Sequence, residues 1–162
     1  MANTTFSGPV RSENGFKSIS KHATSGAITE ITTYGGAPVS LSDGNVTLTN
    51  ATHSGRILLV PDGGQDNTYT LPAPVAGSVF KFVYAGGAAD ATDAIIVTPG
   101  NTNFYIGGVT FLDTDGNEVS SVFSDGNSNS SIQLNVPAGF EVTIVGLNTT
   151  NYQIFGNVTS TT

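Results

Sequence analysis

The chain has 162 residues, and 72 of them are Gly, Thr, Ser or Asn, residue types that helix interiors use poorly. This composition disfavours a helical bundle. Five basic and twelve acidic residues are too few, and a hydrophobic share of 38% is too large, for a disordered chain. Without cysteine there can be no disulfide, thiolate catalyst, iron–sulfur cluster or Cys-ligated zinc. At this length we expect one folded core.

The net charge of −7 bears on the class of partner. Five Lys and Arg residues cannot supply the surface that neutralises nucleic-acid phosphates, which argues against a general nucleic-acid binder. The longest aliphatic run, at 57–60, is far shorter than a membrane span, and residues 1–10 contain no apolar signal-peptide region. We therefore expect a protein that neither crosses a membrane nor carries a visible export signal.

The first 26 residues differ from the rest in charge and pattern. Residues 1–30 carry a net charge of +1 and residues 31–162 a net charge of −8. No hydrophobic period is sustained over 1–26, so we predict an extended arm there and a β-domain over 27–162. The arm is either a frayed chain end or a segment that orders on a partner. In the second case its apolar anchors and basic contacts are Phe6, Val10, Phe16, Arg11, Lys17 and Lys21.

From about residue 28 the pattern changes to short β-branched runs separated by glycine-containing turn pairs, two of which are Asp115-Gly116 and Gly107-Gly108. No window of eleven or more residues has a helical period. We predict an all-β fold with almost no helix, an antiparallel, jelly-roll-like β-sandwich. Its strands are expected at 28–33, 46–49, 56–60, 68–71, 79–84, 94–98, 104–106, 109–112, 119–123, 131–136, 141–145 and 152–155.

Segments 68–82 and 131–144 share one form, in which a strand is followed by Pro, then Ala-Gly, then a second strand. Proline ends donation to the strand ladder, and Ala-Gly permits a compact reversal. We predict a hairpin-like corner in each segment, and two instances are too few to indicate a solenoid.

The aromatic residues of segment 79–84 alternate along the predicted strand. A period of two places Phe80, Phe82 and Tyr84 on one face. This pattern indicates a core or a subunit interface before it indicates a platform for sugar binding.

The residues that carry enzyme chemistry are sparse and unpatterned. His22 and His53 are the two histidines, and neither has a partner at metal-ligand spacing, so both are interpreted as surface or loop residues. The chain contains no G-x-S-x-G nucleophile motif and no phosphate-binding glycine loop. We expect no enzyme activity, no catalytic residue and no cofactor.

The densest group of carboxylates lies at 113–118. Asp113, Asp115 and Asn117 alternate as in the first half of a calcium loop, but Glu118 stands where such a loop needs glycine. A β-turn with acidic residues facing solvent explains the segment equally well. Asp90 and Asp93 form a similar loop with the same interpretation, and we assign no metal ligand.

Several stretches are similar to the capsid decoration (cement) proteins of marine tailed bacteriophages, and together they span nearly the whole chain. They are TTFSGPVRSENGF at 4–16, GRILLVPD at 55–62, YTLP at 69–72, AG at 76–77, NTNFYIGG at 101–108 and SDGNSNS at 124–130. The resemblance implies a β-rich, non-catalytic homotrimer near the local three-fold positions of an icosahedral shell. Its partner would be the major capsid protein. It would be made in the host cytoplasm and would lie on the outer surface of the virion.

Two other functions stay open. A phage tail-fibre or receptor-binding β-domain has similar Leu-Pro and Ala-Gly units, and its loops would bind host glycans. The second alternative is a calcium-dependent carbohydrate-binding module centred on Asp113 and Asp115. For the decoration protein, we expect the arm to dock on the shell and trimer formation to multiply a weak contact through effective concentration.

Overall fold

The computed structural model describes residues 18–21, 24–26, 28–31, 37–87 and 91–160. The chain divides into two compact units, Met1–Thr33 and Tyr34–Thr162. In the first unit, β1 (Ser18–Lys21) and β2 (Ile28–Ile31) pair antiparallel, with Ser18 opposite Ile31. The strand predicted at 28–33 is therefore present, but its partner is a strand inside the predicted arm. The division between the units also differs from the boundary predicted after residue 26.

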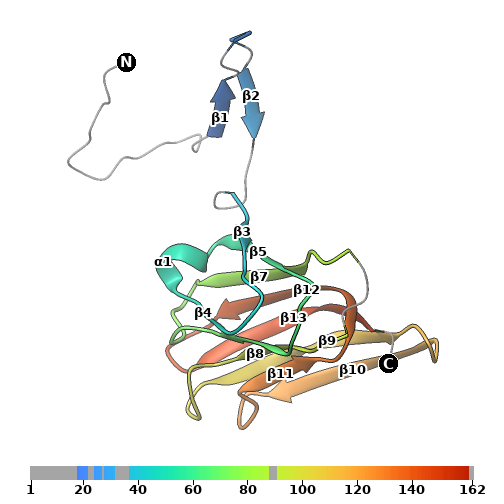
Figure 1. Ribbon diagram of the computed structural model, residues 1–162. Helices are drawn as coiled ribbons and strands as arrows, with labels where there is room; N and C mark the ends of the chain where they lie inside the picture. The colour runs from blue at the N-terminus through green and yellow to red at the C-terminus, as the bar shows by residue number, and fades with distance from the viewer. Residues whose placement is uncertain (1–17, 22–23, 27, 32–36, 88–90, 161–162) are drawn as a thin grey trace. The chain divides into compact units, whose positions relative to one another are not determined.

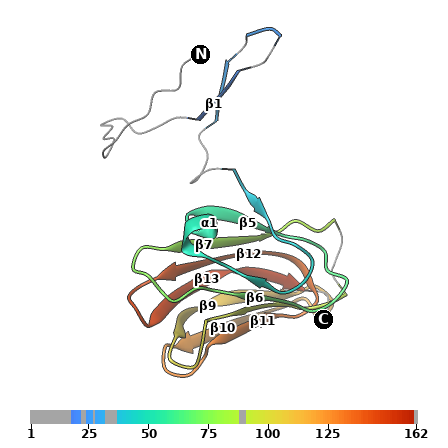
Figure 2. The same cartoon turned by 60° about the vertical axis from the view of Figure 1, so that its left-hand side comes forward.

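The second unit consists of two β-sheets (Figure 1). The seven-stranded sheet has the order β10-β9-β13-β12-β7-β5-β3 and the four-stranded sheet the order β11-β8-β6-β4. Figure 2 shows the larger sheet running from β5 to β10. The elements are β3 (Val39–Ser40), β4 (Val46–Thr47), α1 (Asn50–His53), β5 (Arg56–Val60), β6 (Asn67–Thr70), β7 (Val79–Tyr84), β8 (Ala94–Val97), β9 (Phe104–Asp113), β10 (Glu118–Asp125), β11 (Ser131–Leu134), β12 (Pro137–Gly146) and β13 (Asn151–Ser160).

The all-β fold with almost no helix is confirmed. In the described part of the chain the one helix is α1, of four residues, which Thr49 caps by accepting a hydrogen bond from the Thr52 backbone N–H. No helix among the described residues is long and apolar enough to cross a membrane. Short β-branched runs without a helical period give this result because their side chains pack best on a pleated surface.

The core lies between the two sheets and is built from the alternating inward side chains of both. Phe80 and Phe82 of β7 are fully buried, and the half-buried Tyr84 packs against the same cluster, so the aromatic face predicted for this strand is core. The ring of Phe82 lies 6.2 Å from that of Tyr69 on β6 in the opposite sheet. The buried Tyr105 hydroxyl of β9 donates a hydrogen bond to the Ile96 carbonyl of β8, which also joins the sheets.

The prediction of antiparallel pairing needs correction, because five of the nine strand pairings in this unit are parallel. From β3 to β8 the chain passes to the other sheet after every strand. Strands two apart therefore run in the same direction and pair in parallel, β3 with β5 and β5 with β7 in one sheet, and β4 with β6 and β6 with β8 in the other. Residues 39–97 thus form three stacked coils of a short solenoid.

Two local predictions are also corrected. The turn predicted at Gly107-Gly108 is wrong, because both glycines lie inside the continuous strand β9. Gly107 has φ +94°, and a Cβ there would lie 2.6 Å from the Ile154 carbonyl oxygen, so glycine serves close approach of β13. Segments 68–82 and 131–144 are corners between the sheets, since β6 leads to β7 and β11 to β12 without pairing. They are not hairpins.

Candidate interaction surface

The residues predicted to contact a partner belong to the first unit. Phe6, Val10, Arg11, Phe16 and Lys17 lie outside the described residues. Lys21 ends β1, where it stands opposite Ile28 in the strand pairing. The contact predicted for these six residues therefore remains a prediction.

The candidate calcium loop is a hairpin turn between β9 and β10. The Asp113 carboxylate accepts hydrogen bonds from the backbone N–H groups of Asp115 and Gly116, at 2.9 and 3.0 Å. Asn117 has φ +54°, a left-handed conformation that asparagine tolerates in turns. Among the residues that the structure describes, no group of three or more His, Asp or Glu side chains could hold a metal ion. The turn interpretation accounts for this segment.

His53 and the buried tyrosines have structural partners. The Nδ1 atom of His53, in the last position of α1, accepts a hydrogen bond from the Thr49 backbone N–H at 3.0 Å. Burial raises the pKa of Tyr152 to about 12. The pKa of Tyr105 is also raised, mainly by burial and to a smaller extent by the charge of Tyr152. The Tyr152 hydroxyl donates to the Pro72 carbonyl at 2.9 Å. These two hydroxyls are therefore hydrogen-bonded within the core. His22 lies outside the described residues.

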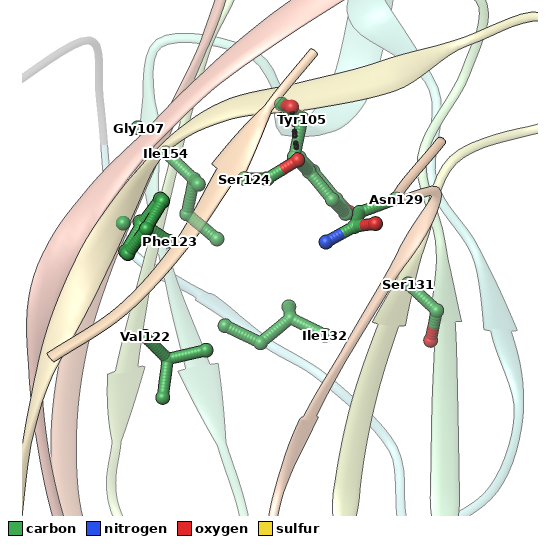
Figure 3. Close-up of a pocket in the computed structure, with 10 residues that line it drawn as sticks. Tyr105, Gly107, Val122, Phe123, Ser124, Asn129, Ser131, Ile132 and Ile154 are labelled. Atoms are coloured by element: carbon green, nitrogen blue, oxygen red, sulfur yellow. Dashed lines mark hydrogen bonds between the residues drawn. The ribbon is translucent and has the colours of Figure 1, made fainter. Parts of the chain in front are cut away.

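A hollow opens between β10 of the larger sheet and β11 of the smaller sheet (Figure 3). Val122 and Ile132 face each other across it, and the Ser124 hydroxyl donates a hydrogen bond to the Tyr105 carbonyl at its upper rim. Its volume of about 50 Å³ has room for a few water molecules, whereas pockets for metabolites measure about 300–1,000 Å³. The hollow is therefore too small to enclose a metabolite.

Strand β10 is the most exposed strand of the second unit. It forms one edge of the seven-stranded sheet, and seven of its eight residues are exposed. Among them are Val119, Val122 and Phe123, with exposed fractions of 68%, 57% and 77%. Val119 and Phe123 lie on one face of the strand and Val122 lies on the other, so apolar side chains meet water on both faces.

The outer face of the same sheet continues this apolar surface. Phe123 of β10 stands opposite Gly108 of β9, which stands opposite Phe155 of β13, and Val119 stands opposite Leu112. Leu112 and Phe155 are 38% and 48% exposed. We call the group of Leu112, Val119, Phe123 and Phe155 the apolar patch. Exposed apolar patches of this kind mark interaction surfaces.

The sequence contains a signal for this surface that the strand prediction did not use. In segment 119–123, Val119 and Phe123 fall on one face of a strand and Val122 on the other. A strand with apolar residues on both faces is either buried on both or covered by a partner. Position along the chain does not distinguish these cases, because burial depends on which strand becomes the sheet edge.

The basic side chains of the second unit form contacts within that unit. Its two basic residues are Arg56 and Lys81. Arg56 donates hydrogen bonds to the Ala37 and Thr52 carbonyls, and Lys81 forms a salt bridge with Glu141 at 2.7 Å. The surface of this unit therefore offers an acidic partner no unpaired cation.

Three aspartates lie in the turns that lead into β4, β6 and β8 of the stacked coils. Asp66 and Asp93 directly precede β6 and β8, and Asp43 stands three residues before β4. We call Asp43, Asp66 and Asp93 the aspartate column. The pairing of Asn67 with Ala94 places Asp66 beside Asp93, and the parallel pairing of β4 with β6 brings the turn that holds Asp43 next to the turn that holds Asp66.

Each carboxylate of the column accepts hydrogen bonds from the layer that follows it. Asp43 accepts from the Gly64 backbone N–H and the Asn67 side chain, at 3.1 and 3.0 Å. Asp66 accepts from the Asp93 N–H at 2.9 Å, and Asp93 from the Val136 N–H at 3.0 Å and the Gln133 side chain. The aspartate column therefore joins successive layers by hydrogen bonds. The sequence did not indicate this role for Asp93. Asp90 lies outside the described residues.

The Asp43 clamp predicts a dependence of stability on pH. The hydrogen bond from Asn67, and then that from Gly64, lowers the pKa of Asp43 from its ordinary value of 3.8. A carboxyl with a lowered pKa in the folded state stabilises the protein above 3.8, and this stabilisation is lost as pH falls through the folded-state pKa. In thermal melts from pH 2 to 7, the melting temperature of wild type should exceed that of Asp43→Asn at neutral pH. The difference should disappear in acid.

Asn67→Ala provides the control for this pH dependence, because it removes the larger cause of the lowered pKa. In that background the change in melting temperature caused by Asp43→Asn should depend less on pH. A gap between wild type and Asp43→Asn that stays constant from pH 2 to 7 would contradict the assignment of the clamp to the ionised carboxylate.

No protein-family model matches the chain, and no curated protein is similar to it.

Proposed function

We propose that the protein is a non-catalytic structural protein of a phage virion, which binds the outer surface of the assembled capsid and stabilises it. In this role the second unit is a rigid body, and the first unit supplies the contact with the major capsid protein. The resemblance to decoration proteins motivates the proposal, and the charge division of the chain supports it.

The charge division is the observation that carries this function. In the second unit Arg56 and Lys81 are consumed by internal contacts. The remaining cations of the chain, Arg11, Lys17 and Lys21, all belong to the first unit. Phe6, Val10 and Phe16 are interspersed with them in the sequence. Apolar anchors beside basic residues suit docking on an acidic protein surface, because steering and burial then act at one place.

Co-sedimentation with undecorated capsids tests the role of the first unit. A variant lacking residues 1–33 removes the whole unit, including both strands of its hairpin, and leaves Tyr34–Thr162 with its own core. We expect this variant to stay in the supernatant while the full chain pellets with the shells. Unchanged pelleting would overturn arm-mediated docking. Far-UV circular dichroism of the variant serves as the control for folding.

A charge variant separates electrostatic from apolar contributions. Arg11→Gln, Lys17→Gln and Lys21→Gln together should weaken capsid binding about tenfold, since three partly exposed ion pairs of about 0.5 kcal/mol each sum to roughly that factor. The variant should also reduce the dependence of binding on salt. Full-strength binding with an unchanged salt dependence would assign docking to the apolar residues alone.

The alternative function is a tail-fibre or receptor-binding β-domain that recognises host glycans. The exposed rings of Phe123 and Phe155 on either side of Gly108 favour it, because sugars bind against open aromatic faces. Copy number per particle separates the two functions. Quantitative gel analysis of virions should give hundreds of copies for a decoration protein and tens for a fibre, and a fibre-like number would favour the alternative.

A further inference from the structure

Strand β10 presents eight residues of backbone at a free sheet edge. Its neighbour β9 occupies one side, so the N–H and C=O groups on the other side have no strand partner within the described sheet. Natural edge strands are commonly protected by proline, lysine or shortness. Segment 118–125 contains neither proline nor lysine, and it carries Val119, Val122 and Phe123 exposed. Such an edge needs a partner strand.

The other edges of the two sheets are too short to supply that strand. In the described chain β3 and β4 have two residues each and β11 has four, against eight in β10. The partner that matches β10 along its whole length is β10 of a second copy. We propose that two copies of this chain associate through antiparallel pairing of their β10 strands about Ser121.

The sequence of β10 is self-complementary in that register. With Ser121 opposite Ser121 of the second copy, Val119 faces Phe123, Ser120 faces Val122 and Glu118 faces Ser124, and each of these contacts occurs twice. An aromatic ring opposite a β-branched side chain is a favourable cross-strand pair. Of the two registers one residue away, the one with Ser121 opposite Val122 would place Glu118 opposite Asp125 twice, which like-charge repulsion disfavours. The other, with Ser120 opposite Ser121, would place the charged Glu118 opposite Phe123 twice. Contacts repeated by two-fold symmetry are the property of an isologous interface.

Pairing in this register also aligns the apolar patches of the two copies. Leu112 and Val119 are neighbours across β9 and β10, and Phe123, Gly108 and Phe155 are neighbours across β10, β9 and β13. Because Val119 meets Phe123 of the second copy, the two rows become one apolar row across the junction. The association therefore covers the edge backbone and reduces the exposure of Val119 and Phe123, the two most exposed large apolar side chains among the described residues.

This inference does not depend on the capsid role. The pair of copies takes the place of the homotrimer that the resemblance implies. If the pairing and the capsid role both hold, one pair of copies presents two first units to the shell, and the second contact gains from effective concentration. A monomeric variant would then still pellet with capsids, but with lower affinity. The measured oligomeric state therefore tests the pairing, and co-sedimentation tests the capsid role, so either proposal can be contradicted without the other.

Light scattering of the full chain tests the pairing. We expect wild type to have twice the 16.6 kDa mass of one chain and Ser121→Lys to have the mass of one chain, since the two lysines would face each other across the axis. Ser42→Lys, at an exposed serine in the loop after β3, should remain paired. Mixing Ser121→Lys with Ser121→Asp should restore the doubled mass, because opposite charges then meet at the axis.

Crosslinking gives a second readout that does not depend on charge. The chain has no cysteine, so Ser121→Cys introduces a single thiol. Directly opposed residues of antiparallel strands have Cα atoms about 4.5–5.5 Å apart, within the range of disulfides. We expect rapid oxidation to a covalent dimer, and no such product from Ser42→Cys. A wild-type mass of one chain, or a dimer or trimer that Ser121→Lys leaves intact, would overturn the proposal.

Discussion

Truncation of Phe82 to alanine should lower the free energy of unfolding by about 3–5 kcal/mol, the usual cost of emptying a large aromatic site in a core. Phe82 is fully buried in β7, and its ring contacts Tyr69 of the opposite sheet. The cavity would open between the two sheets, where neither strand can move inward without breaking its ladder. Urea unfolding followed by circular dichroism measures the loss, and with native domains stable by about 5–15 kcal/mol the variant should be close to unfolding.

Phe123→Ala is the matched control, since it removes the same atoms at a position 77% exposed. It should cost less than about 0.5 kcal/mol, as surface substitutions away from special features do. The comparison is best made in the Ser121→Lys background, where pairing through β10 is blocked. Similar losses at both positions would contradict the assignment of Phe82 to the core and Phe123 to the surface.

The second large effect is expected at Asp93. Asp93→Ala removes the acceptor for the Val136 N–H and the Gln133 side chain, which tie the last coil of the solenoid to the β11–β12 corner. Val136 has φ +39°, a strained conformation for a β-branched residue, and loss of its hydrogen bond leaves the strain without compensation. We expect a loss of about 2–3 kcal/mol, the cost of leaving a partly buried donor unpaired after removal of a charged acceptor.

Asp115→Ala is the corresponding control, because Asp115 is exposed in the β9–β10 turn. Its effect on the free energy of unfolding should stay within about 0.5 kcal/mol. Hydrogen exchange would locate the damage in Asp93→Ala, where the amides of β8 and β11 should lose protection before those of β12 and β13. Equal loss of protection in all four strands would contradict a local clamp.

Much of the secondary structure could be predicted because it follows from neighbours in the chain. The strands predicted at 56–60 and 79–84 have the same bounds as β5 and β7. Alternation placed Phe80 and Phe82 on the buried face correctly. Glycine pairs marked most breaks between strands, but Gly107-Gly108 shows the limit of that signal. A glycine chosen for close approach of another strand looks the same in sequence as a glycine chosen for a turn.

The candidate surface was less accessible to prediction. The exposure of Val119, Val122 and Phe123 follows from β10 standing at the end of the sheet order, which is a property of the whole topology. The six residues predicted for partner contact remain a prediction, and the case for them still rests on charge and apolar character in the sequence.

By itself, the sequence determined that the chain is an all-β protein without thiol chemistry, with a basic N-terminal part, an acidic remainder and a strand pattern of period two. These properties depend on composition and on residues one or two apart. The tertiary structure alone decided that strands two apart pair in parallel, that Asp43, Asp66 and Asp93 stack as clamps, and that β10 is left at an edge. Each of these depends on which sheet a strand joins, and that choice is set by packing between residues tens of positions apart.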